Sequence, residues 1–152
     1  MIGRYTLPAM GRIWEEEQKL QCWLRVEIAA VDVLAEMGQI PKEAAAIIRT
    51  KAGFDVTRVQ EIEEKVRHDV IAFLTAVGEK VGPESRWIHL GLTSSDMLDT
   101  ATALQLVAAA DLLIGSMTRL REAVARRAQE FRRTPMVGRT HGIHAEPTTF
   151  GL

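Results

Sequence analysis

The sequence is poor in cysteine and in aromatic residues. Cys22 is the single cysteine in 152 residues, which excludes a scaffold stapled by internal disulfides and favours a reducing compartment, the cytoplasm. Aromatic residues make up 5% of the chain, whereas 47% of it is hydrophobic. Ala and Leu supply much of that hydrophobic share, a balance that favours helix over sheet. We therefore expect an all-α, cytoplasmic protein.

The sequence also lacks a surplus of charge and a long apolar run. Its 19 Lys and Arg nearly balance 20 Asp and Glu. The densest basic cluster, over residues 126–133, has no aromatic residues laid out for base stacking. The longest apolar runs, such as residues 70–77, fall well short of the roughly 20 residues of a membrane span, and no signal peptide is evident. We expect no nucleic-acid and no membrane partner.

Apolar residues recur every three to four positions over most of the chain, which predicts a succession of helices. Glycine and proline mark the expected ends, and Asp55 is a plausible N-cap. The polar triplet Arg67-His68-Asp69 predicts a break or kink. The predicted elements are an extended arm over 1–11, helices over 12–37 and 41–51, a helical stretch over 56–81 that contains this break, a connector over 84–92, a long helix over 95–131, and a loop over 136–152.

The predicted long helix carries a heptad-like apolar seam. At about 1.5 Å per residue it would extend roughly 55 Å, more than a compact 152-residue globule would span. We therefore expect it to pack against chain that this sequence does not include, and we interpret the sequence as a truncated fragment. The expected domains are 1–92, a helical domain, and 93–152, the start of a long-helix bundle. The seam comprises Ala103, Leu106, Ala110, Leu113, Met117, Leu120, Val124, Ala128 and Phe131.

All four histidines, His68, His89, His141 and His144, fall at segment edges or in connectors. Histidine titrates near neutral pH, and reactive groups are common on loops held by a rigid scaffold. Taken singly, each of these histidines is also typical of an ordinary surface or hydrogen-bonding residue. Their association with other polar groups makes them candidates for a site.

A metal site is a possible interpretation of the last segment, where His141, His144 and Glu146 supply three donors. Such sites usually need a helix to place two imidazoles on one face. Gly142 and Pro147 indicate irregular backbone instead, so we predict no metal.

Other short polar segments could bind an anion. Thr93-Ser94-Ser95-Asp96 begins the long helix, where hydroxyls and unpaired N–H groups can bind a carboxylate or simply cap the helix. The strings Arg4-Tyr5 and 67–69 offer anion-binding arginines beside aromatic or titratable partners.

Together these strings resemble, in order and spacing, the adenylosuccinate lyase family of the fumarase/aspartase superfamily. The resemblance spans the whole chain, and its last two motifs are highly specific. Many superfamily members carry Gln where this sequence has Ile143. The resembling stretches are Ile2-Gly3-Arg4-Tyr5, Arg67-His68-Asp69-Val70, HLGLTSSD over 89–96 and GRTHGIHAEPTTFG over 138–151.

The resemblance implies a C–N lyase of purine nucleotide biosynthesis with no cofactor. Such enzymes eliminate fumarate from adenylosuccinate, giving AMP, and from the succinylated aminoimidazole carboxamide ribotide. They are homotetramers whose active sites are shared between subunits through long helices. Their catalytic base is a serine well beyond position 152, so we expect this chain alone to be inactive.

The resemblance also assigns roles to individual residues. His141 matches the general acid toward the leaving nitrogen, and His68 matches a supporting residue at the substrate. Thr93 and Ser94 match the residues that bind the succinyl carboxylate. The remaining matched substrate-binding positions are Arg4, Tyr5, Arg67, Asp69 and His89.

Two alternatives remain open at the level of sequence. A sister lyase of the superfamily, acting on argininosuccinate for example, would share the scaffold and the elimination chemistry. A non-enzymatic helical assembly module would account for the seam and the balanced charge, with the histidines incidental.

Overall fold

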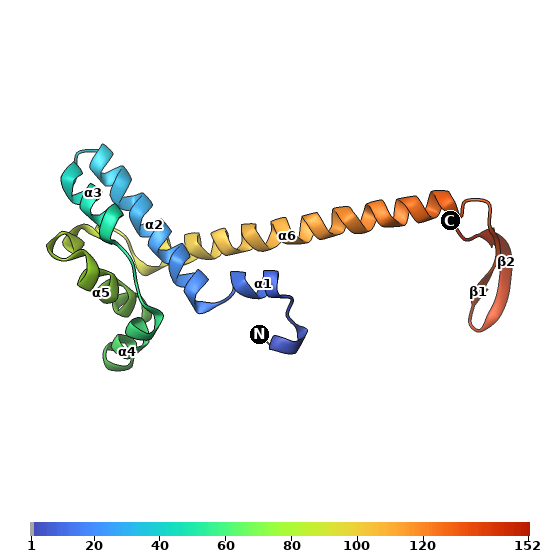
Figure 1. Ribbon diagram of the computed structural model, residues 1–152, viewed down its shortest axis with the longest axis horizontal. Coiled ribbons are helices and arrows are strands. Elements are labelled where there is room, and N and C mark those ends of the chain that lie inside the picture. Colours follow the sequence, from blue (N-terminus) through green and yellow to red (C-terminus); the bar gives the residue numbers. More distant parts are fainter. Residues whose placement is uncertain (1) are drawn as a thin grey trace. The chain divides into compact units, whose positions relative to one another are not determined.

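The computed structural model describes residues 2–152 (Figure 1). They divide into two compact units, the residues up to Ala109 (unit 1) and Ala110–Leu152 (unit 2). Helices dominate, as predicted, and a small two-stranded sheet is the exception. The elements are η1 (Gly3–Tyr5), α1 (Pro8–Ile13), α2 (Glu16–Glu36), α3 (Lys42–Lys51), α4 (Val56–Val66), α5 (Asp69–Val81), η2 (Pro83–Trp87), α6 (Ser94–Glu130), β1 (Pro135–Thr140) and β2 (Ile143–Thr149).

The core of unit 1 lies between helices α2 to α5 and the start of α6. Phe73 of α5 is fully buried, and its ring meets that of Trp23 edge to face at 5.4 Å between centroids. Along α2 the buried positions fall on one stripe, as an amphipathic helix requires. They are Leu20, Trp23, Leu24, Glu27, Val31 and Ala35, together with Cys22.

The predicted extended arm is wrong, because residues 8–13 form α1. Pro8 stands in the first turn of that helix, where a missing N–H and a fixed φ favour helix rather than breaking it. Glu15 is extended, with φ −71° and ψ 152°, and so separates α1 from α2 where one helix was predicted. Gln105 of α6, which is buried, donates from its amide to the carbonyl of Ile13 at 2.6 Å and so caps the end of α1.

The predicted break at residues 67–69 is confirmed. Asp55 caps α4 by accepting the Arg58 N–H at 2.9 Å, as expected. The helix ends at Arg67, whose left-handed backbone reverses the chain, and α5 begins directly after His68. The break is therefore a tight turn between two helices that pack against each other.

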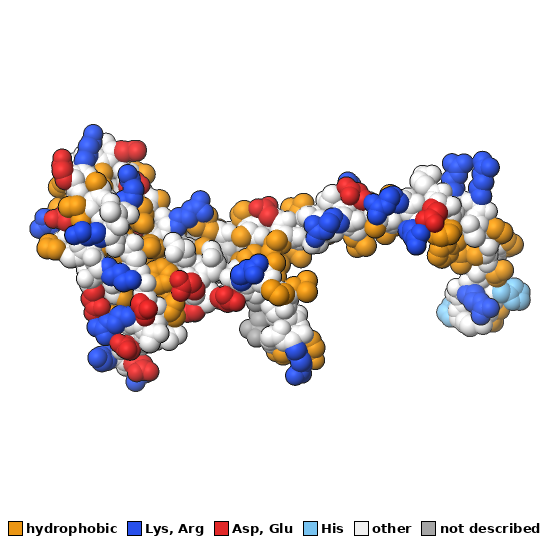
Figure 2. Space-filling view, in the orientation of Figure 1, with side chains coloured by type: hydrophobic (Ala, Val, Ile, Leu, Met, Phe, Trp, Pro, Cys, Tyr) orange, Lys and Arg blue, Asp and Glu red, His pale blue; other side chains and the backbone are white. Residues whose placement is uncertain are grey.

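Helix α6 confirms the predicted long helix. Its buried positions, Met97, Ala101, Gln105 and Ala109, all lie in its first half. Beyond them the apolar seam is open to solvent, and Figure 2 shows apolar side chains exposed along this helix. The large seam residues are between 55% and 68% exposed: Leu106, Leu113, Met117, Leu120 and Val124.

By length and composition alone, α6 is also long and apolar enough to cross a membrane. An 18-residue window has a mean hydropathy of 1.5, and 22% of that window is buried. The core helix of a helical bundle passes the same test. The property depends on the average composition of the window and not on an uninterrupted apolar run.

The predicted loop over 136–152 is wrong, because β1 and β2 form an antiparallel hairpin. Because the sheet has only two strands, both are edge strands. Proline is tolerated on an edge strand, and Pro147 lies opposite Val137. The ring of Phe150 packs edge to face on Phe131 at 5.0 Å, which ties the hairpin to the end of α6. Gly151 lies so close to that helix end that a Cβ would stand 2.2 Å from the Ala128 carbonyl oxygen.

Candidate functional site

Three of the predicted site residues adopt a left-handed backbone. Arg67, His89 and His141 have φ of 55°, 64° and 52°, and within residues 2–152 no other non-glycine residue has a positive φ. This conformation costs an ordinary residue roughly 1–2 kcal/mol and persists where the surroundings demand it. Three of the nine predicted site residues therefore account for all the left-handed non-glycine backbone within residues 2–152.

The turn between α4 and α5 presents Arg67, His68 and Asp69 side by side, all exposed. His68 Nδ1 accepts the Ile71 N–H at 3.5 Å and lies equally far, 3.5 Å, from the carboxylate oxygen Oδ1 of Asp69. The carboxylate of Asp69 accepts the N–H of Val70 at 2.7 Å. This arrangement leaves the Arg67 guanidinium and His68 Nε2 available to a ligand.

An ion pair holds the two helices that flank this turn. Arg58 of α4 donates from Nε and Nη2 to the two carboxylate oxygens of Glu79 of α5, at 3.0 and 2.7 Å. The hydrogen bonds with Glu79, and a weaker one with Glu61, raise the pKa of Arg58. The same hydrogen bond from Arg58 lowers the pKa of Glu79.

His89 is held by a residue that the sequence analysis missed, Glu27 of α2. The carboxylate oxygen Oε2 of Glu27 accepts the His89 backbone N–H at 2.9 Å, and Oε1 lies 2.5 Å from the ring nitrogen Nδ1. Glu27 is 1% exposed. Its place on the apolar stripe of α2, where a charged side chain is unusual, is the signal that could have identified it.

Thr93 and Ser94 lie at the first turn of α6, four and five positions after His89. The Thr93 N–H donates to the Asp96 carboxylate at 2.8 Å, and the Asp96 N–H donates to the Thr93 carbonyl at 3.1 Å. The capping task thus falls to Asp96. The hydroxyls of Thr93 and Ser94 are left for another partner at the positive end of the helix.

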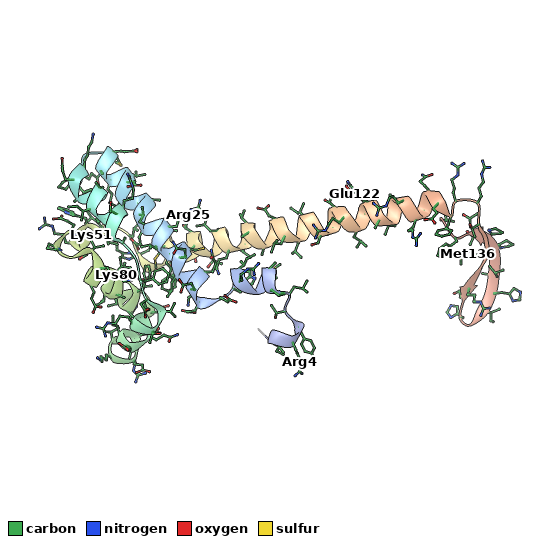
Figure 3. All side chains as sticks on the ribbon, viewed as in Figure 1. Arg4, Arg25, Lys51, Lys80, Glu122 and Met136 are labelled. Atoms are coloured by element: carbon green, nitrogen blue, oxygen red, sulfur yellow. The ribbon has the colours of Figure 1, made fainter. Side chains whose placement is uncertain are left out.

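Arg4 and Tyr5 form a pair in η1. The guanidinium carbon of Arg4 lies 4.8 Å from the centroid of the Tyr5 ring, and Tyr5 is 74% exposed. Figure 3 shows Arg4 at the outer edge of its segment. A guanidinium stacked on an aromatic ring keeps its N–H groups free for a phosphate or carboxylate.

His141 and Gly142 form the turn of the hairpin in unit 2. Thr140 pairs with Ile143, which leaves a two-residue turn with φ of 52° and 75°, the type I′ conformation that suits a hairpin. His141 is exposed there, and Figure 2 shows histidine side chains at this end of the hairpin. The strand partner of His144 is Arg139.

A groove of about 1100 Å³ lies between α2, the connector and the start of α6. Its walls include Val26, Val33 and Leu90, and its polar lining comes from residues such as Asp96 and Asp99. None of the predicted site residues lines it. Eight of the nine predicted residues belong to unit 1, and His141 belongs to unit 2. Within residues 2–152 no three His, Cys, Asp or Glu side chains are grouped to hold a metal ion.

Comparison with known proteins assigns this helical fold and its motif-bearing turns to one family. A family model described as "Lyase" matches residues 3–152, and the chain belongs to this family. Among its relatives is the protein named adenylosuccinate lyase of Synechocystis sp., to which it is 61% identical over 152 residues. The proteins of the same name from Bacillus subtilis and Thermotoga maritima are 49% and 46% identical over 152 residues. The resemblance inferred from the motifs is confirmed.

Solved structures agree on the fold. The fumarate lyase from Mesorhizobium sp. BNC1 superposes with a TM-score of 0.89 at 31% identity, covering 99% of this chain and 37% of that one. The 3-carboxy-cis,cis-muconate lactonizing enzyme from Pseudomonas putida gives 0.88 at 32% identity, covering 97% and 35%. The matches to the three adenylosuccinate lyases cover 100% of this chain and 35% of each relative. The chain thus spans about a third of their length.

Proposed function

We propose that the full-length protein, meaning the protein of the relatives' length that contains these 152 residues, is an adenylosuccinate lyase. It eliminates fumarate from adenylosuccinate and from the succinylated aminoimidazole carboxamide ribotide in purine nucleotide biosynthesis. The observation that carries this proposal is the 61% identity over the whole chain to a protein of that name.

The elimination has three chemical requirements. A base removes a carbon-bound proton beside a carboxylate, an acid protonates the leaving nitrogen, and donors stabilise the charge that builds on the carboxylate. We assign the acid to His141. Its exposed position on a tight turn supports this role, since the ring is free to meet a substrate. The base lies outside this chain.

The remaining predicted residues bind the two anionic ends of the substrate. Thr93 and Ser94 receive the succinyl carboxylate, which is supported by their place at the start of α6 and by the capping role of Asp96. His68 supports the reaction from the turn after α4. The nucleotide contacts are assigned to Arg4, Tyr5, Arg67, Asp69 and His89.

We further propose that the full-length protein is a cytoplasmic homotetramer with active sites shared between subunits. The exposed seam of α6 supports this, because large apolar side chains repeated along one helix are typical of a bundle interface. Residues 1–92 would form the N-terminal helical domain, and residues 93–152 would begin the central bundle. The high hydropathy of α6 has the same explanation.

The test is a substrate comparison with purified full-length protein. Fumarate is followed by its absorbance, and AMP by chromatography, with adenylosuccinate and argininosuccinate supplied separately and then together. We expect fumarate and AMP in equal amounts from adenylosuccinate and no turnover of argininosuccinate. Turnover of argininosuccinate alone would favour the sister lyase, and turnover of neither would favour the assembly module.

The 152-residue chain alone should release no fumarate. It spans 35% of its relatives' length, and the proposal places the catalytic base outside it. Fumarate release by the purified 152-residue chain would contradict this assignment.

A further inference from the structure

Glu27 is a charged side chain placed where α2 otherwise carries core residues. It is 1% exposed, and the neighbouring buried positions on its stripe are Trp23, Leu24 and Val31. A carboxylate in such surroundings is unfavourable unless its oxygens receive hydrogen bonds. Glu27 therefore needs partners.

Both oxygens of Glu27 are bonded to one residue, His89, which is 62 positions further along the chain. The bond from the backbone N–H holds His89 in the left-handed conformation, with φ of 64°. The bond from the ring fixes the rotation of the side chain, which is 19% exposed. Holding the backbone alone would not require the second bond.

We propose that Glu27 is a positioning residue that fixes both the orientation and the tautomer of His89. With Glu27 ionised, Nδ1 carries a hydrogen and donates it to Oε1. The second ring nitrogen, Nε2, points away from Glu27 and is presented to the substrate. A carboxylate that orients an imidazole in this way also favours one tautomer over the other. The inference rests on the proposed function, in which His89 is a substrate-binding residue.

The substitution Glu27→Gln separates this role from simple packing. Glutamine has nearly the same shape, and its carbonyl oxygen can still accept the His89 backbone N–H. Its amide then places an N–H donor against Nδ1, which can only accept if the ring hydrogen moves to Nε2. The variant therefore inverts the tautomer while preserving the volume of the buried side chain.

The kinetic test uses full-length protein carrying Glu27→Gln, His89→Gln or both, and measures kcat and KM for adenylosuccinate. The matched control is Glu17→Gln, the same change at an exposed position of α2. We expect Glu27→Gln to lower kcat/KM by about 10- to 100-fold, the scale for losing a carboxylate that orients a ligand-binding histidine. The double variant should be no worse than the more damaged single variant.

Two results would overturn the inference. One is a kcat/KM for Glu27→Gln equal to that of the control. The other is a double variant whose loss is the product of the two single losses, because independent effects on the free energy add. A fall in melting temperature with unchanged kcat and KM would assign Glu27 a purely structural role.

A second measurement does not depend on turnover. Solid-state ¹⁵N spectra of histidine-labelled full-length wild-type protein report which ring nitrogen is protonated, and the His89 signals are assigned by their loss in His89→Gln. We expect Nδ1 to carry the hydrogen. A ring with bare Nδ1 and protonated Nε2 would contradict the inference. If wild-type protein released no fumarate, the proposed function would fail while this spectrum still decided the role of Glu27.

Discussion

At the scale of residues, the hairpin turn determines the backbone conformation and the position of His141. A type I′ turn requires two left-handed residues, and histidine tolerates that conformation better than most. Gly142 supplies the second position, with φ of 75°. The backbone thus places the His141 ring at the end of the hairpin, where chain or substrate can approach it.

We expect His141→Gln in the full-length protein to lower kcat by about 100-fold or more, the scale for loss of a general acid. Steady-state kinetics with adenylosuccinate measures the effect, and light scattering checks that the assembly is unchanged. The control is His144→Gln, the same change on the adjoining strand. Near-normal turnover of His141→Gln would remove this residue from the mechanism.

The sequence allowed the nine candidate residues to be identified but not Glu27. Motifs identify residues that lie close together in the chain, such as Arg67 and His68. The bond between Glu27 and His89 spans 62 positions, and a glutamate within a helix is ordinarily expected at the surface. The structure is needed to show that Glu27 lies on the buried stripe of α2.

At the scale of elements, the hairpin depends on close contact with the end of α6. The N–H of Gly151 donates to the Phe131 carbonyl at 3.0 Å, and the N–H of Phe150 donates to the Thr134 carbonyl at 2.9 Å. A Cβ on Gly151 would meet three backbone atoms of this helix end within 2.7 Å. Backbone cannot move aside as a flexible side chain can.

We expect Gly151→Ala to destabilise the hairpin by about 1–3 kcal/mol, the scale of overpacking. Faster amide hydrogen exchange over residues 135–149 of the full-length protein would show it. Gly3→Ala is the control, because nothing lies within 4 Å of its added Cβ. Unchanged exchange in Gly151→Ala would mean that this contact does not hold the hairpin.

The Arg58–Glu79 pair predicts a pH-dependent contribution to stability. The pKa of Glu79 is lowered in the folded chain by its bond to Arg58, so the pair stabilises above the unfolded value, roughly 4.3. Its contribution is lost as pH falls through the folded value.

Glu79→Gln should therefore lower the melting temperature slightly at pH 7, since both groups are exposed. At a pH below the folded pKa of Glu79 the variant and the wild type should melt alike. Glu64→Gln, an exposed carboxylate of α4, is the control. A difference that persists in acid would show that the ion pair is not its cause.

Most helices could be predicted because the spacing of the apolar residues agrees with the residues that begin or end a helix. Examples are the N-cap Asp55 and the break over 67–69. Two of the errors, over residues 1–11 and 136–152, have clear physical causes. Pro8 was interpreted as a helix breaker although a first turn accepts proline. The strands of the hairpin are mostly exposed, so they lack the alternation of apolar and polar residues by which strands are recognised.

At the scale of the whole molecule, the exposed apolar seam of α6 is the feature that calls for a partner outside this chain. Large contiguous apolar patches on a protein surface mark sites of interaction with a partner. The sequence predicted the seam, but it could not show which chain covers it.

We expect Met117→Glu to dissociate the proposed tetramer of the full-length protein and to abolish turnover, since a carboxylate buried without a partner in the proposed interface is strongly unfavourable. Analytical ultracentrifugation measures the assembly. Thr118→Glu, which adds the same charge on a different face of α6, should remain assembled. A tetramer that survives Met117→Glu would place the interface elsewhere.

The central claim is that His141 protonates the leaving nitrogen of a succinylated nucleotide. The most direct measurement is a crystal structure of the full-length protein with adenylosuccinate bound. The account predicts the His141 ring within hydrogen-bond reach of that nitrogen, about 2.6–3.2 Å, directly or through one water. A substrate bound with its leaving nitrogen far from His141 would contradict it.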